Sequence, residues 1–198
     1  MKYFYLLIAF LLCASSQLLG QNAELKKLME QDQAVRQPGK EINDGNRDET
    51  RVQRVLELLA KGAAQTPEDK FNAALVLQHT PLTFREGRLA SESPYNYLLA
   101  YYLFWESYEA GYKDARELVA MSMDRYLTFT QGHQKYGTNV LTNQKTGKDE
   151  WVPIDRETPD SERAKYGVPP LATLLKQYPE QKTQNKSSTP GKVHQKAR

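Results

Sequence analysis

The sequence predicts a mainly α-helical protein: a single-domain helical bundle of antiparallel helix hairpins with a small C-terminal β-hairpin. Three observations favour this fold class. Apolar residues recur at helical spacing along residues 21–180. Glycine and proline separate the periodic segments, and residues 138–154 change to a strand-like pattern around a glycine-containing loop. The predicted helices span residues 22–36, 47–62, 66–81, 95–110, 113–129, 159–167 and 169–178.

The first two helices are predicted from their apolar stripes and their breaks. Residues 22–36 carry leucine, methionine and valine near helical spacing, and the segment QPGKEINDGN then ends the pattern. In residues 47–62, Asp48 and Glu49 lie in the first turn, where the helix dipole favours acids, and Gly62 lies close to the C-cap. One face of this helix carries four aliphatic side chains, Val52, Val55, Leu56 and Leu59.

The third helix has the clearest end signals. Thr66 is the expected N-cap, Pro67 suits the first helical position, and Asp69 stands at the third position, where it completes a capping box. Pro81 stops the helix because proline cannot donate the next backbone hydrogen bond. Residues 82–94 are predicted to form a loop.

The next two helices are predicted to pack as an antiparallel pair. Residues 95–110 are rich in tyrosine and include Trp105, whereas residues 113–129 present small alanine and serine side chains. Gly111 joins the two segments. Small residues that face large aromatics, with a glycine in the connection, favour a close helix hairpin.

The first twenty residues have the layout of a secretory signal peptide. One lysine precedes an apolar run that is too short to span a bilayer, and small and polar residues follow. We expect cleavage after Gly20, with Ser15 and Ser16 as alternatives, and export to the periplasm or the extracellular space. The mature chain would carry no transmembrane segment. Leu12 precedes Cys13 where a lipid-attachment signal has a small residue, which argues against a lipoprotein.

The basic charge of the chain belongs to its two ends. The whole sequence has 27 basic and 24 acidic residues, and six of the basic residues but none of the acidic ones lie in the leader or in residues 181–198. Residues 21–180 therefore form a slightly acidic domain, and a nucleic-acid-binding surface is not indicated. Residues 181–198 are predicted to be a disordered basic tail. Cys13 is the single cysteine, which excludes disulfides and Cys-ligated zinc from the mature domain.

Five sequence blocks resemble a known family. EQDQAVR, AALVLQHT, DRYL, GHQKYGTN and RAKYGVPPL occur in this order. Together they resemble an uncharacterised bacterial family, domain of unknown function 6624, over about residues 24–178. The resemblance implies a shared fold and brings no established activity. Pro81 stands where family members often have an acid, and Asn139 stands where they have glutamine. A catalytic role for that acid would leave this chain impaired.

Polar and charged residues recur at the predicted helix ends and in the segment GHQKYGTN. We predict that they converge on one polar pocket, although they lie far apart in the sequence. The expected pocket residues are Asp32, Arg36, Gln78, His79, Asp124, Arg125, Gln134, Tyr136, Thr138 and Arg163.

His79 and Asp124 are the candidate catalytic residues. His79 is either a general base or phosphate-binding imidazole that Asp124 or Asp32 orients, or a histidine bonded to the carbonyls of a helix end. Asp124 pairs with Arg36 or Arg163, or accepts backbone N–H groups of the following turn. No metal site is predicted, because His79 has no partner histidine at helical spacing.

Three functions follow from these residues. The first is a binding or interaction module for an anionic small molecule or an envelope protein. The alternative is a metal-independent hydrolase or transferase in which His79 is the base, Asp124 orients it, and Arg36 or Arg125 holds an oxyanion. The second alternative has no ligand, and the polar residues lock the fold. None of the three calls for a cofactor.

Overall fold

The computed structural model describes residues 20–37, 45–85, 88–142, 147 and 149–177. It is mainly α-helical, as the sequence predicts. The helices are α1 (Ala23–Ala34), α2 (Gly45–Ala60), α3 (Pro67–Leu77), α4 (Tyr95–Glu109), the 3-10 turn η1 (Lys113–Ala115), α5 (Arg116–Gln131), α6 (Asp160–Lys165) and α7 (Leu171–Gln177). The strands are β1 (Leu82–Arg85), β2 (Arg88–Ser91), β3 (Val140–Thr142) and β4 (Asp149–Trp151). The predicted leader, apart from Gly20, and the predicted tail lie outside the described residues.

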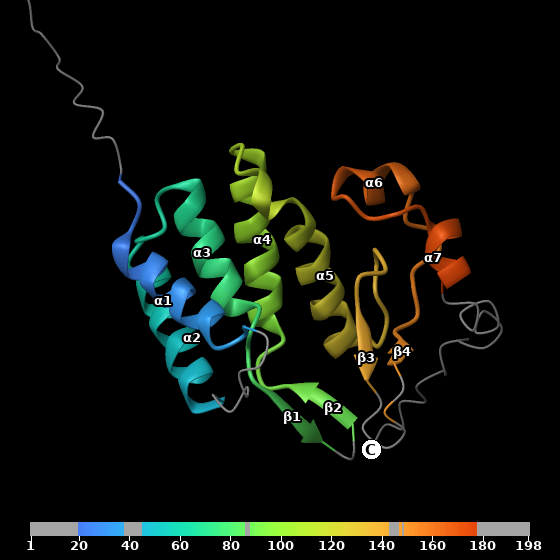
Figure 1. The fold of residues 1–198 in the computed structure, drawn as a ribbon, viewed down its shortest axis with the longest axis horizontal. Helices are drawn as coiled ribbons and strands as arrows, with labels where there is room; N and C mark the ends of the chain where they lie inside the picture. Colours follow the sequence, from blue (N-terminus) through green and yellow to red (C-terminus); the bar gives the residue numbers. More distant parts are fainter. Residues whose placement is uncertain (1–19, 38–44, 86–87, 143–146, 148, 178–198) are drawn as a thin grey trace, which may run out of the picture.

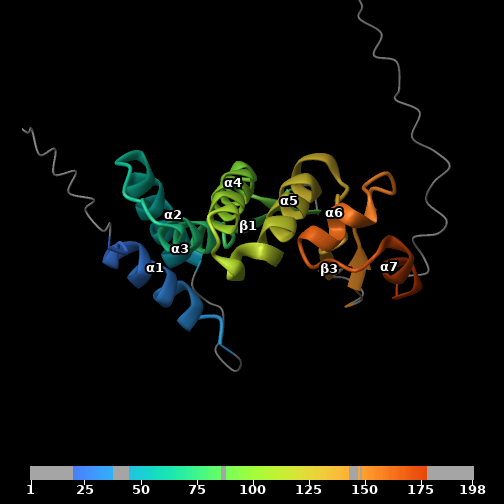
Figure 2. The same cartoon turned by 90° about the horizontal axis from the view of Figure 1, so that it is seen from above.

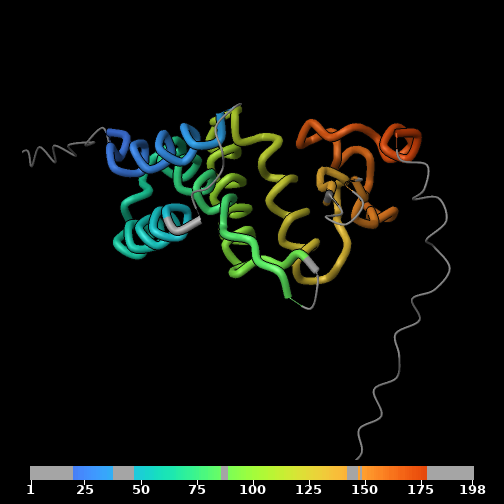
Figure 3. The backbone as a smooth tube through the Cα atoms, turned by 60° about the horizontal axis from the view of Figure 1, so that its bottom comes forward, coloured from blue at the N-terminus to red at the C-terminus, as the bar shows by residue number. Residues whose placement is uncertain are grey.

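The elements form one row that follows the order of the chain (Figures 1 and 2). α1 and α2 lie at one end, α3, α4 and α5 stand side by side in the middle, and α6 and α7 lie at the other end with β3 and β4. α3 packs against α1, α2 and α4, and α4 packs against α5. Figure 3 shows the β1–β2 hairpin along one edge of the row, reaching from α3 toward β3.

The core lies where small residues let the helices approach each other. Ala73, Ala100 and Ala120, from α3, α4 and α5, are fully buried. Phe104 of α4 is also fully buried and meets Phe71 of α3 edge-on, with 5.6 Å between the ring centroids. The predicted packing of α4 against α5 is confirmed, but Trp105 is 39% exposed, and the buried rings of α4 are those of Tyr97 and Phe104.

The predicted capping box at the start of α3 is confirmed. Thr66 Oγ1 accepts a hydrogen bond from the backbone N–H of Asp69 at 3.1 Å, and the Asp69 carboxylate accepts one from the Thr66 N–H at 3.0 Å. The same carboxylate accepts the backbone N–H of Asn22 at 2.6 Å. Because Asn22 is itself the N-cap of α1, one buried acid fixes the starts of two helices.

The segment 82–94, predicted as a loop, contains a β-hairpin instead. β1 and β2 pair antiparallel, with Leu82 opposite Ser91 and Phe84 opposite Leu89. The apolar pattern gives little warning because neither strand presents a buried face. Leu82 and Phe84 are 48% and 60% exposed. The predicted C-terminal hairpin is confirmed, with Val140 opposite Trp151.

No helix in the described part of the chain combines the length and the apolar character that crossing a membrane requires.

Candidate functional site

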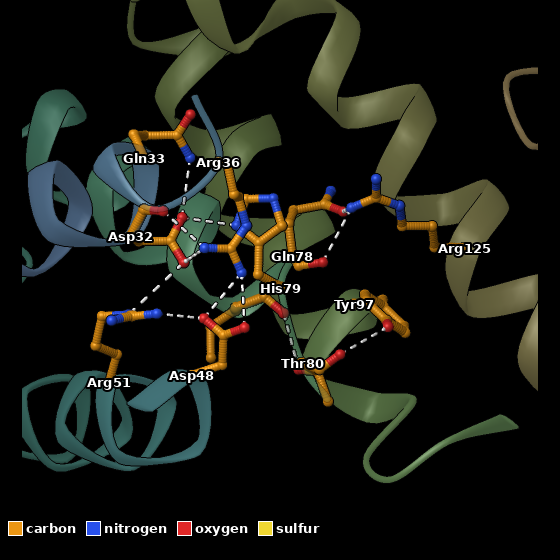
Figure 4. Close-up of polar contacts among 11 residues, drawn as sticks. Asp32, Gln33, Arg36, Asp48, Arg51, Gln78, His79, Thr80, Tyr97 and Arg125 are labelled. Carbon is orange, nitrogen blue, oxygen red and sulfur yellow. Dashed lines mark hydrogen bonds and ion pairs between the residues drawn. The ribbon is translucent and has the colours of Figure 1, made fainter. Parts of the chain in front are cut away.

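The site begins with Asp32 in the last turn of α1, whose carboxylate is buried (Figure 4). Its Oδ2 lies 2.7 Å from Nδ1 of His79 and accepts a hydrogen bond from Gln33 Nε2 at 2.9 Å. Its Oδ1 lies 2.9 Å from Nη1 of Arg36. Since a buried carboxylate is stable only when it is paired, these contacts fix both the acid and its partners.

Arg36 joins α1 to the first turn of α2. Its Nη1 donates to the backbone carbonyl of Asp32 at 2.7 Å, and its Nη2 donates to both oxygens of Asp48, at 2.8 and 2.9 Å. Arg51, one turn further along α2, also bonds Asp48. Two arginines and two aspartates therefore balance each other's charge at this corner of the molecule.

His79 follows the C-terminus of α3 and connects this corner to the middle of the row. The segment that carries it is held by α4, because Asn96 Nδ2 donates to Thr80 Oγ1 at 3.0 Å and the Tyr97 hydroxyl donates to the Thr80 carbonyl. The His79 side chain is 22% exposed. When Nδ1 carries the proton that it shares with Asp32, Nε2 keeps a lone pair, and no described residue occupies it.

Arg125 of α5 completes the group from the other side, as Figure 4 shows. Its Nη1 donates to the carbonyl and to the side-chain oxygen of Gln78, at 2.9 and 2.5 Å, and the Gln78 amide bonds Ser122. Among the described residues, no carboxylate pairs with Arg125 and no acceptor takes its Nε–Nη2 edge. Burial lowers the pKa of Arg125, and the like charge of Arg36 lowers it further.

These side chains line one open cavity of about 460 Å³. Its polar wall includes Arg36, Gln78 and His79, which follow the ends of α1 and α3, together with Asp48 of α2 and Arg125 of α5. Asp32 and Arg51 support this wall from behind. Cavities of this volume hold small molecules, and they usually place a few polar groups against an otherwise apolar surface. The Nε–Nη2 edge of a guanidinium takes a carboxylate or phosphate through two parallel hydrogen bonds.

Asp124 belongs to a different group, although it is the neighbour of Arg125 in α5. Its Oδ1 accepts the backbone N–H groups of Lys135 and Tyr136, at 2.7 and 2.8 Å. Its Oδ2 accepts those of Gly137 and Thr138, at 2.9 and 2.8 Å, together with the Thr138 hydroxyl at 2.8 Å. Burial raises the pKa of Asp124, and these hydrogen bonds oppose the rise. Of the partners considered from the sequence, the structure selects the backbone, and Asp32 rather than Asp124 orients His79.

The remaining predicted residues lock the same turn. Gln134 accepts the Asn139 N–H at 2.7 Å and donates to the Asn139 and Val152 carbonyls. Arg163 is fully buried and bonds the backbone carbonyls of Lys135, Tyr136, Asp155 and Thr158. The hydroxyl of Tyr136 donates to Glu162 at 3.0 Å.

The residues predicted to form one pocket therefore fall into two separate groups. The structure brings together Asp32, Arg36, Gln78, His79 and Arg125 at the cavity, and it places Asp124, Gln134, Tyr136, Thr138 and Arg163 in the lock around residues 134–139. Asp48 and Arg51 were missed as site residues. Their spacing of three along α2 was a signal for a pair, but nothing local pointed to Arg36, twelve positions before Asp48.

Within the described ranges, no three His, Cys, Asp or Glu side chains gather as metal ligands would. No model of a known family matches the chain, and neither the curated proteins nor the solved structures contain a significantly similar one.

Proposed function

We propose that this chain is an exported binding module that holds a small anion in the cavity through Arg125. One observation carries the proposal: a largely buried guanidinium lines the cavity without a carboxylate partner among the described residues. Arg36 and Arg51 are paired with Asp32 and Asp48, so none of the described carboxylates compensates the positive charge of Arg125. We propose export from the leader sequence, and we propose membership of domain of unknown function 6624 from the five sequence blocks.

The energetics support an anion at this place. Taking a charge out of water costs several kcal/mol unless a partner compensates it, and the nearby Arg36 repels Arg125. An anion on the free edge of Arg125 would remove both penalties. Purely structural arginines in this chain look different, since Arg163 directs its guanidinium at protein oxygens.

Arg125→Gln is expected to abolish anion binding without unfolding the protein. Thermal unfolding in acetate would raise the melting temperature of the wild type, since a ligand that binds only the folded state at 100 times its Kd stabilises by about 2.7 kcal/mol. The variant should show no such rise. Removal of the desolvated charge and loss of the two hydrogen bonds to Gln78 change its own stability in opposite directions, so its melting temperature in acetate is compared with that of the same variant without acetate.

The control for that experiment is Arg54→Gln, which removes an exposed arginine paired with Glu24 and Glu57. This variant should keep the full response to acetate. An Arg125→Gln protein that responds like the wild type would exclude Arg125 as the anchor.

The Asp32–His79 contact favours a second candidate, hydrolysis with His79 as general base. Nε2 would take a proton from water while that water attacks an acyl carbon, and Arg125 would stabilise the oxyanion. The tetrahedral intermediate would then collapse, which breaks the bond to the leaving group, and the proton on Nε2 would pass to that group. His79→Gln should then lower the rate of p-nitrophenyl acetate hydrolysis by about 100-fold or more. His133→Gln, at the loop histidine, is the matched control and should keep the rate. A wild-type rate no higher than that of His79→Gln would eliminate this candidate.

A further inference from the structure

The cavity has a second wall that the anion site does not use. Pro81 and Leu82 from β1 and its approach, Leu89 from β2, Phe129 from α5, and Val140 and Leu141 from β3 line it. The two hairpins thus supply apolar surface to the same cavity that the charged side chains line. Leu82 is 48% exposed and Val140 is 37% exposed, so this surface stays open to solvent.

Both hairpins have only two strands in the described part of the chain, which leaves these apolar side chains accessible to solvent. In β1 and β3, Leu82 is the backbone partner of Ser91 and Val140 is that of Trp151, and in the described part of the chain each strand is paired on one side only. Single exposed aliphatic residues are common on protein surfaces. Here two of them belong to one cavity together with an uncompensated guanidinium, which is the arrangement that an amphipathic ligand requires.

We infer that the ligand is an organic monocarboxylate with an apolar chain, whose head binds Arg125 and whose chain lies between the two hairpins. This inference rests on the proposed function, because it needs the anion to bind at Arg125. Among the described residues that line the cavity, Arg36 is paired with Asp32 and Asp48, which leaves Arg125 as the cation for one carboxylate. The planar Nε–Nη2 edge matches a carboxylate.

The test is a calorimetric titration of the protein with acetate, butanoate and octanoate. Complete burial of one methylene group strengthens binding about fourfold. Because this wall is partly open, we expect about twofold per methylene, and hence at least tenfold tighter binding of octanoate than of acetate. Octyl phosphate should bind more weakly than octanoate if the site selects a monoanion.

Two variants distinguish binding of the ligand's apolar chain from binding of its carboxylate head. The double variant Leu82→Ser and Val140→Ser should bind acetate as the wild type does and lose most of the gain from acetate to octanoate. Both side chains are exposed, so the variant should remain folded, which its melting temperature checks. Phe84→Ser is the matched control: Phe84 lies in the same strand β1, is 60% exposed and does not line the cavity.

Each outcome decides between the two proposals. Equal affinities for acetate and octanoate would overturn the amphipathic ligand and leave the anion site in place. Unchanged chain-length dependence in the double variant would show that the chain lies elsewhere, and octyl phosphate binding more tightly than octanoate would overturn the choice of carboxylate. Wild-type protein that binds none of the four anions would overturn both proposals.

Discussion

Replacing Asp124 with asparagine is expected to lower the free energy of unfolding by about 3 kcal/mol or more, because at least two hydrogen bonds to a charged acceptor are lost and each is worth about 1.5–3 kcal/mol. The carboxylate accepts four backbone N–H groups and one hydroxyl from residues 135–138. An asparagine offers one acceptor oxygen, so its amide nitrogen would face backbone donors in either orientation.

Urea unfolding measures this effect through a change in the midpoint at constant slope. Asp114→Asn is the control, since Asp114 is exposed in η1 and the same chemical change there should stay within about 0.5 kcal/mol. A loss below about 1 kcal/mol in Asp124→Asn would contradict the account of Asp124 as the acceptor that holds this turn.

Gly137→Ala is expected to lower the free energy of unfolding more than the exchange of any other described glycine for alanine. Gly137 has φ +99°, a conformation that other residues rarely adopt, and an added Cβ would lie 2.8 Å from Cδ1 of Leu174 and 3.2 Å from Cδ1 of Ile154. Leu174 is buried, so it has little room to move away. Overpacking of this kind costs about 1–3 kcal/mol, in addition to the backbone strain.

Gly111→Ala is the control that separates the backbone strain from the packing contribution. Gly111 has nearly the same φ, +97°, but an added Cβ would meet nothing within 4 Å. Gly111→Ala should therefore report the backbone strain alone, about 1–3 kcal/mol. Equal losses in the two variants, measured by urea unfolding, would mean that the contact with Leu174 has no energetic consequence.

Most of the fold could be predicted from the sequence because its signals are local. Thr66, Pro67 and Asp69 mark the start of α3 within four residues, and the glycine-containing loop of the second hairpin has strand-like residues on both sides. The β1–β2 hairpin escaped prediction because its apolar residues face solvent or the cavity and form no buried stripe. The end of α5 also differs: the helix continues to Gln131, two residues beyond the predicted end, and η1 replaces its first turn.

The site was harder to predict because its contacts span long separations. His79 meets Asp32 across 47 positions, and Arg125 meets Gln78 across 47. Residue type could nominate Asp124 as readily as Asp32 for the partner of His79. Only the folded chain distinguishes them, because Asp124 points into the turn that follows its own helix while Asp32 is brought in from α1.

The two polar groups have opposite chemical characters. The oxygens of Asp124 and the guanidinium of Arg163 are surrounded by protein partners, which supports the structural-lock hypothesis for residues 134–139. Arg125 lines a cavity, and among the described residues its Nε–Nη2 edge and Nε2 of His79 have no partner. Polar groups whose hydrogen bonds are all made within the protein hold a fold together. Polar groups beside a cavity that still lack a hydrogen-bond partner are available to a ligand.

The most direct measurement of the central claim is an NMR titration of the arginine Nε–Hε signals with butanoate. The signal of Arg125 can be assigned by its absence from the spectrum of Arg125→Gln. It should shift along a saturable curve, because the anion takes the free Nε–Nη2 edge, while the exposed Arg54 signal stays in place. An Arg125 signal that does not move, or that moves only in proportion to every other arginine signal, would contradict the claim that this cavity is an anion-binding site.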